Sequence, residues 1–206
     1  METKDSVQQK WFDCLHTAHV KIRQTDSLVT TFGEISNKQA YDIQAMLVED
    51  RLQNGEHIIG WKVGATSLST MAQLNITEPI LGCMTSASYY PLHDGVKASD
   101  FCQLAVEGEI AFLMGKSLRG PGITKADTIT ATAGIMAAVE LVDSRTKGWK
   151  PSITEDIADN SLHAGIILGS SMRSIIGFDL SREGVILRKN GSLLAVYFCI
   201  VSGLQR

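Results

Sequence analysis

Two glutamates, Glu107 and Glu109, stand two positions apart in the mostly apolar segment 106–114. The segment is typical of a β-strand, in which alternate side chains share a face, so both carboxylates lie on one face about 7 Å apart at the backbone. Carboxylates this close repel each other unless they are solvated, protonated or bridged by a cation. The pair is therefore either an exposed, solvated strand face or part of a cation site.

A third glutamate, Glu140, lies in the otherwise uncharged segment 134–142. An ionised side chain in such a segment is costly to bury without a partner. The three glutamates together would offer only oxygen ligands, which suit Mg²⁺ or Mn²⁺ and leave positions for water and a chelating substrate. The alternative for Glu140 is an ion pair with Arg145 or Lys62.

Lys62 is flanked by glycines in the segment 60–67, which is typical of a strand that leads into a helix. It is either an ordinary surface residue or a buried ammonium group that holds an anion or acts as an acid or base. The polar stretches 143–145 and 157–161 adjoin apolar strands and are either caps and turns or the rim of a pocket. The five histidines show no metal-ligand spacing, and we assign them no role.

The elements that must position these groups change character near residue 56. Before it, apolar residues recur at helical spacing in the segment 7–22, and the segment 36–54 begins with a capping-box pattern and ends at an Asn-Gly stop. After it, short runs of Val, Ile and Leu alternate with Gly, Ser and Asp, which is typical of strands joined by brief helices. We expect strands near residues 58–63, 106–114, 135–142, 164–168 and 185–188, and helices over 67–74 and 125–133.

The predicted fold class is α+β, with an N-terminal helical arm over residues 1–56 and a β-rich body over residues 57–206. Asn190-Gly191 lies between two apolar runs and predicts a type I′ hairpin with a returning strand.

Composition excludes several classes of function. The chain has 206 residues with 19 basic and 22 acidic side chains, and the basic ones are scattered, so a nucleic-acid partner is not expected. The longest apolar run, residues 193–201, is too short for the roughly 20 residues that span a bilayer. The charged N-terminus lacks the apolar block of a secretion signal, and the four cysteines form no C-x-x-C motif. We therefore expect a cytoplasmic protein without a membrane partner.

Taken together, the motifs resemble the fumarylacetoacetate-hydrolase superfamily, and within it the hydratase/decarboxylase branch. Five ordered motifs carry the resemblance: GWKVGATS at 60–67, EPILG at 78–82, VEGEIAF at 106–112, ELVDSR at 140–145 and DIADNS at 156–161. In that order they are far more specific than any one of them alone. The resemblance implies a mixed β-roll of the fumarylacetoacetase C-terminal type, preceded by the helical arm.

The resemblance also implies a site. Glu107, Glu109 and Glu140 match the residues that hold a divalent metal, Mg²⁺ or Mn²⁺, and Lys62 matches a catalytic lysine that also contacts substrate. Glu78 is then a second catalytic candidate, which would guide water, and Ser161 a substrate contact. A metal chelated by the carboxylate and 2-oxygen of a small substrate would stabilise the enolate formed on the way to the 2-oxo tautomer.

The activity implied is a metal-dependent hydratase that adds water to a 2-hydroxy-2,4-dienoate in the degradation of aromatic compounds. One alternative is decarboxylation of a 2-oxo-3-enedioate, which would use the same metal. A second is an inactive relative that acts as a subunit or binding partner, because the residues after about 194 do not resemble the family's continuation and the roll is expected to lack its last strands. Exposed apolar surface on a shortened roll predicts a homo-oligomer. The resemblance implies the same, since members of this family form homo-oligomers.

Overall fold

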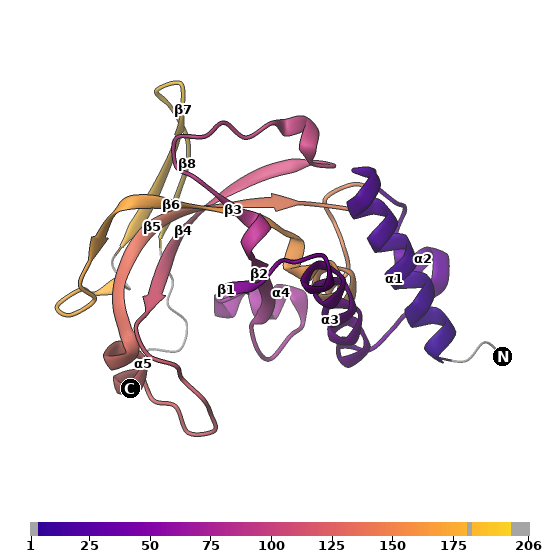
Figure 1. Ribbon diagram of the computed structural model, residues 1–206, viewed down its shortest axis with the longest axis horizontal. Coiled ribbons are helices and arrows are strands. Elements are labelled where there is room, and N and C mark those ends of the chain that lie inside the picture. Colours follow the sequence, from indigo (N-terminus) through magenta and orange to yellow (C-terminus); the bar gives the residue numbers. More distant parts are fainter. Residues whose placement is uncertain (1–3, 181–182, 199–206) are drawn as a thin grey trace.

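The computed structural model describes residues 4–180 and 183–198, and it contains both of the predicted long helices. Helices α1 (Lys4–Lys21) and α3 (Asn37–Gln53) lie with the short α2 (Leu28–Phe32) on one side of the strands (Figure 1). The capping box that begins α3 is present. The Ser36 hydroxyl accepts from the Gln39 backbone N–H, and the Gln39 side-chain oxygen accepts from the Ser36 backbone N–H. The second helix was therefore predicted for the right physical reason.

The central sheet has four strands in the order β3 (Tyr89–Tyr90), β6 (His163–Arg173), β5 (Thr132–Asp143) and β4 (Leu104–Met114). The β3–β6 pair is parallel and the other two pairs are antiparallel, so the sheet is mixed, as the predicted α+β roll requires. Glu107 on β4 is paired directly with Glu140 on β5, and Glu109 is paired with Ala138. This register brings all three glutamates to one face of the sheet.

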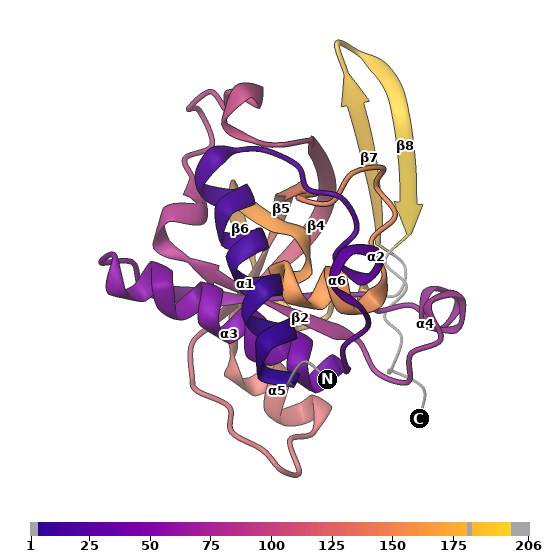
Figure 2. The same cartoon turned by 90° about the vertical axis from the view of Figure 1, so that its right-hand side faces the viewer.

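Two antiparallel strand pairs accompany the sheet. Strand β1 (Ile58–Gly64) pairs with β2 (Ile80–Thr85), and β7 (Gly184–Lys189) pairs with β8 (Ser192–Phe198). The β7–β8 turn has positive φ at both Asn190 and Gly191, which confirms the type I′ hairpin. Figure 2 shows this hairpin projecting beyond the sheet.

The hairpin meets the sheet at β4. A Cβ on Gly108 would overlap the Val185 side chain, so the missing side chain of this glycine lets β7 approach. Gly108 faces away from its two glutamate neighbours because adjacent residues of a strand point to opposite faces. The hairpin therefore packs on the back of the sheet and leaves the glutamate face open.

The remaining elements are short. They are helices α4 (Leu68–Leu74), α5 (Lys125–Ala131) and α6 (Ile153–Ala158) and the 3₁₀ turns η1 (Ser86–Ser88), η2 (Ala98–Asp100) and η3 (Asn160–Leu162). Helices α4 and α5 were predicted, whereas β2 and α6 were not. Strand β2 has a glycine at its centre and no alternation, and α6 is too brief to show a helical period.

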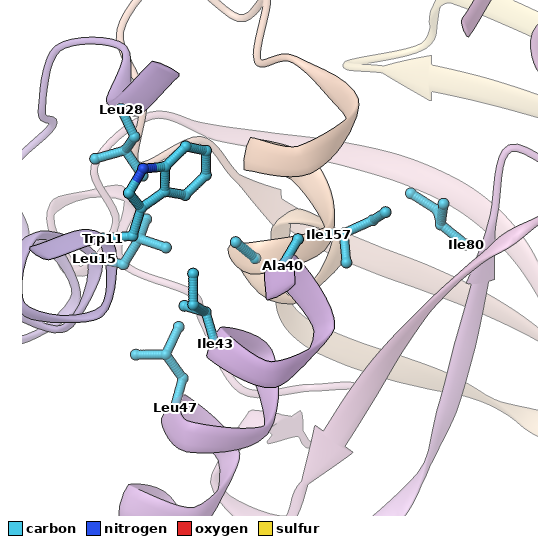
Figure 3. Packing of buried hydrophobic residues seen from close by; sticks show 9 residues of the cluster. Trp11, Leu15, Leu28, Ala40, Ile43, Leu47, Ile80 and Ile157 are labelled. Carbon is cyan, nitrogen blue, oxygen red and sulfur yellow. The ribbon is translucent and has the colours of Figure 1, made fainter. Parts of the chain in front are cut away.

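The main hydrophobic core joins the helical arm to the body. Its buried members come from the three N-terminal helices, from β2 and from α6 (Figure 3), and are Trp11, Leu15, Leu28, Ala40, Ile43, Leu47, Ile80, Ile157 and Ala158. Gln44 crosses the same boundary, since its side-chain amide donates to the carbonyl oxygens of Leu81 and Ile157, each at 2.9 Å. The division of the chain at residue 56 stays a prediction.

Across the described residues, the helices are too short or too polar to cross a membrane.

Candidate metal centre and active site

The three sequence-predicted glutamates meet at one point on the open face of the sheet. Each can offer a carboxylate oxygen that lies within 4.8 Å of those of the other two. Glu107 and Glu109 remain open to solvent on one side, whereas Glu140 is buried. The arrangement is an all-oxygen cluster, and such donor sets suit hard divalent cations.

The electrostatics of the cluster favour a bound cation. Burial raises the pKa of Glu109 to about 7, with the charges of Glu140 and Glu107 adding to the effect. Burial also raises the pKa of Glu107, while Lys62 opposes the rise. Three carboxylates in this space repel each other, so a cation bound among them removes a real energetic cost.

Lys62 lies beside the cluster. Its Nζ atom is 3.0 Å from Glu140 Oε2 and 2.9 Å from the carbonyl oxygen of Ser161, and only 13% of its side chain is exposed. The surface interpretation of this lysine is therefore wrong, and the ion pair between Lys62 and Glu140 exists alongside the carboxylate cluster. Arg145, the other partner considered for Glu140, pairs instead with Asp159 and Asp143.

Glycines in the β1–β2 pair make room for the lysine. Lys62 is paired with Gly82, and a Cβ on Gly82 would lie 2.6 Å from the Asn160 carbonyl oxygen and 2.9 Å from Lys62 Cγ. Heavy atoms do not approach a Cβ so closely in real structures. The stem of Lys62 thus crosses β2 through space that only a glycine leaves free.

The turn that contacts Lys62 has an unusual backbone. Asn160, Ser161 and Leu162 all have φ between 53° and 56°, a left-handed conformation that residues other than glycine seldom adopt. The Asn160 side chain holds the turn in place, because it accepts from the Cys83 N–H at 2.7 Å and donates to the Cys83 carbonyl oxygen at 2.8 Å. Ser161 is consequently buried beside Lys62, and its carbonyl oxygen makes the contact.

A buried ion pair anchors the residue before this turn. Arg145 Nε donates to both carboxylate oxygens of Asp159, at 2.7 and 2.8 Å, and the Arg145 Nη2 atom donates to the Asp159 carbonyl oxygen at 3.0 Å. His19 from helix α1 lies 2.9 Å from the same carboxylate. Burial acts to raise the pKa of Asp159, but Arg145 and His19 hold it below its usual range. Arg145 and Asp159 therefore support the turn at 160–162 from a buried position. The interpretation of the segments 143–145 and 157–161 as the rim of a pocket stays a prediction.

Glu78 is the predicted site residue that the structure does not join to the cluster. It is exposed in the loop between α4 and β2. Within residues 4–180 and 183–198, no hydrogen bond or ion pair links it to Lys62 or the glutamates. Its proposed role with water stays a prediction.

Two residues without a predicted role lie at the site. His163 Nδ1 is 2.9 Å from Glu140 Oε1. Among the described residues, one carboxylate oxygen of Asp156 is buried without a hydrogen-bond partner. Burial raises the pKa of Asp156 to about 6; the charges of Asp159 and Glu107 add to this rise, and the charge of Lys62 opposes it. Asp156 lies within a motif that carried the resemblance, whereas His163 has no signal in the sequence.

Comparison with known proteins gives consistent results. A 2-hydroxypent-2,4-dienoate hydratase from Pseudomonas putida is 38% identical over 185 residues, which cover 89% of this chain and 83% of that protein. A 2-hydroxyhexa-2,4-dienoate hydratase from Comamonas testosteroni is 33% identical over 187 residues, covering 89% and 69% of the two chains. No protein-family model matches.

A solved structure is similar along nearly the whole chain. It is the 4-oxalocrotonate decarboxylase of Pseudomonas putida G7, complexed with magnesium and adipate. Its TM-score is 0.89 at 28% identity, and the similarity covers 98% of this chain and 77% of that one.

Proposed function

Because this chain belongs to the family of 2-hydroxydienoate hydratases and 4-oxalocrotonate decarboxylases within the fumarylacetoacetate-hydrolase superfamily, we propose that it is a metal-dependent hydratase of a 2-hydroxy-2,4-dienoate. The product is a 4-hydroxy-2-oxoacid. The observation that carries the proposal is the cluster of Glu107, Glu109 and Glu140 with Lys62 at its edge. Hydratases at 38% and 33% identity favour hydration over decarboxylation, since the decarboxylase structure is 28% identical.

The residues of the cluster fit a resident Mg²⁺ ion. Their oxygen donors lie within 4.8 Å of one another, and on the described residues no cysteine or histidine joins them as a ligand. Such an ion would supply Lewis-acid stabilisation of the negative charge that develops on the substrate's 2-oxygen. The ligand set is proposed as Glu107, Glu109 and Glu140, with Mg²⁺ preferred and Mn²⁺ as the second candidate.

Lys62 is the proposed catalytic residue beside this ion. Its ammonium group is aimed by the Ser161 carbonyl oxygen and Glu140, so it can hold the substrate's negative charge and carry a proton between the 2-oxygen and a substrate carbon. Glu78 is proposed to guide water, a role that rests on its place in the motif EPILG at 78–82. Ser161 is proposed to contact substrate because it lies against Lys62.

The function is tested by following the absorbance of 2-hydroxypenta-2,4-dienoate with purified protein and Mg²⁺. Loss of the dienol signal with formation of a 4-hydroxy-2-oxoacid supports the hydratase. Release of CO₂ from 4-oxalocrotonate in place of hydration would identify the decarboxylase instead. A folded, Mg²⁺-bound protein that turns over neither compound would identify the inactive relative.

The metal role of Glu107 is tested by substitution with glutamine, which keeps the shape and removes the charge. Two unit charges 4 Å apart interact by about 1 kcal/mol in bulk water and about 4 kcal/mol near a protein surface. Against a divalent ion, Glu107→Gln should therefore weaken Mg²⁺ binding at least about tenfold. Calorimetry measures the change, with the exposed Glu34→Gln as a matched control; equal affinities in both variants would remove Glu107 from the ligand set.

The proposed partner is a second copy of the chain. Leu193, Leu194 and Val196 are 50–59% exposed on the β7–β8 hairpin, while residues 199–201 of the same apolar run lie outside the described residues. These three side chains therefore present apolar surface on the part of the chain that the structure describes. We expect a homo-oligomer in light scattering, and a monodisperse monomer at micromolar concentration would contradict it.

A further inference from the structure

His163 is the first residue of β6, and its side chain is fully buried against the metal cluster. We propose that His163 is a positioning residue that holds the Glu140 carboxylate in the orientation needed by a small divalent ion, and thereby sets the affinity and selectivity of the site. The inference rests on the metal role proposed for Glu140.

The hydrogen bonds of the ring fix its orientation. A carboxylate only accepts hydrogen bonds, so His163 Nδ1 donates to Glu140 Oε1, at 2.9 Å. On the other side of the ring, Nε2 lies 3.1 Å from the Ser88 hydroxyl, which is also 2.7 Å from the Thr85 carbonyl oxygen. With Nδ1 donating, Nε2 of the neutral ring is an acceptor, so the single hydroxyl hydrogen of Ser88 is shared between Nε2 and that carbonyl oxygen. Rotation of the imidazole would break the hydrogen bonds at both nitrogens, so the ring and the carboxylate are held as one unit.

The two oxygens of Glu140 therefore have different neighbours. Oε1 accepts the hydrogen bond from His163 Nδ1, whereas Oε2 lies 3.0 Å from Lys62 Nζ at the edge of the cluster. A carboxylate with one oxygen engaged in this way offers a cation its other oxygen. Ca²⁺ commonly takes both oxygens of a carboxylate and accepts irregular sites, whereas Mg²⁺ demands compact octahedral coordination. The His163 hydrogen bond thus disfavours Ca²⁺ relative to Mg²⁺.

A purely structural role for His163 makes a different prediction. If the ring only filled space between β5 and η1, its replacement would lower thermal stability and leave the metal affinity of the folded protein unchanged. If it positions Glu140, the affinity should follow the donor that faces Glu140. Removal of a residue that hydrogen-bonds to a metal ligand typically changes metal affinity by about 10–100-fold.

The experiment compares three variants of the full chain by calorimetry with Mg²⁺ and with Ca²⁺ after removal of metal by a chelator. His163→Asn retains a donor near the Nδ1 position, His163→Gln retains one near Nε2, and His163→Leu retains neither. We expect His163→Leu to weaken Mg²⁺ binding about 10–100-fold. The Mg²⁺ affinity of His163→Asn should stay close to that of the unaltered protein. The ratio of Ca²⁺ to Mg²⁺ affinity should rise in the leucine and glutamine variants.

Controls separate the possible results. His93→Leu removes an exposed histidine and should leave both affinities unchanged. Unaltered Mg²⁺ affinity in a folded His163→Leu protein would overturn the inference. If that variant does not fold, the asparagine and glutamine variants decide, since equal affinities in these two would also overturn it. Failure of the unaltered chain to bind Mg²⁺ is a separate outcome, which would overturn the proposed metal site itself.

Discussion

Replacement of Lys62 by methionine should lower kcat by about a hundredfold or more, because a positioned proton-transfer group typically contributes 10²–10⁴-fold. Methionine keeps an unbranched apolar side chain in the space that Gly82 leaves free, but it removes the ammonium group. The substitution abolishes the ion pair with Glu140 Oε2 and the hydrogen bond to the Ser161 carbonyl oxygen. Neither neighbour can replace the positive charge that Lys62 presents to substrate.

Metal binding should survive this substitution. Lys62 is a positive charge at the edge of a cation site, so its removal lessens repulsion of the ion and Mg²⁺ affinity should not fall. Steady-state kinetics at saturating Mg²⁺, together with calorimetry, measure the two effects separately. Lys38→Met is the matched control, since it removes a lysine ion pair from the exposed surface of α3. Activity equal to that of this control would exclude Lys62 from the mechanism.

Replacement of Gly82 by alanine should reduce both activity and stability, although Gly82 itself carries no chemical group. The new Cβ would meet the Asn160 carbonyl oxygen at 2.6 Å and the stem of Lys62 at 2.9 Å. The lysine stem can move, but the carbonyl belongs to the left-handed turn that the Asn160 side chain holds against Cys83. Overpacking of this kind typically costs about 1–3 kcal/mol of unfolding free energy.

A comparison with Gly95→Ala isolates the steric effect. A Cβ on Gly95 would meet no atom of the described residues within 4 Å, and the φ of Gly95 is not positive, so this variant should be neutral or slightly more stable. Thermal unfolding and kcat are measured for both variants. A Gly82→Ala protein with normal kcat would show that the position of Lys62 does not depend on the space above Gly82.

The carboxylate face was predictable because a strand has a strict two-residue period. That period alone placed Glu107 and Glu109 together, and the cost of a lone charge in an apolar run singled out Glu140. The glycine-flanked segment drew attention to Lys62, and the motif resemblance supplied its catalytic role. These inferences required only local sequence and one comparison of motifs.

His163 was not predictable from local sequence, because its contact with Glu140 arises where β6 packs beside β5. Ser161 shows a related limit. The resemblance implied a substrate contact for Ser161 but gave no contact with Lys62. The observed contact uses the carbonyl oxygen of Ser161, whose direction follows from three consecutive left-handed residues. Backbone conformation of that kind has no signature in residues such as serine and leucine.

The shared hydrophobic core has a consequence for synthesis of the chain on the ribosome. Trp11, Leu15 and Leu47 are made first, but the core that buries them includes Ile157 and Ala158. At about 5–20 residues per second, the interval between Leu47 and Ile157 is on the order of ten seconds. During that time the apolar faces of the nascent helices have no complete partner, so this protein must finish folding late and would gain from chaperone protection of its N-terminal helices.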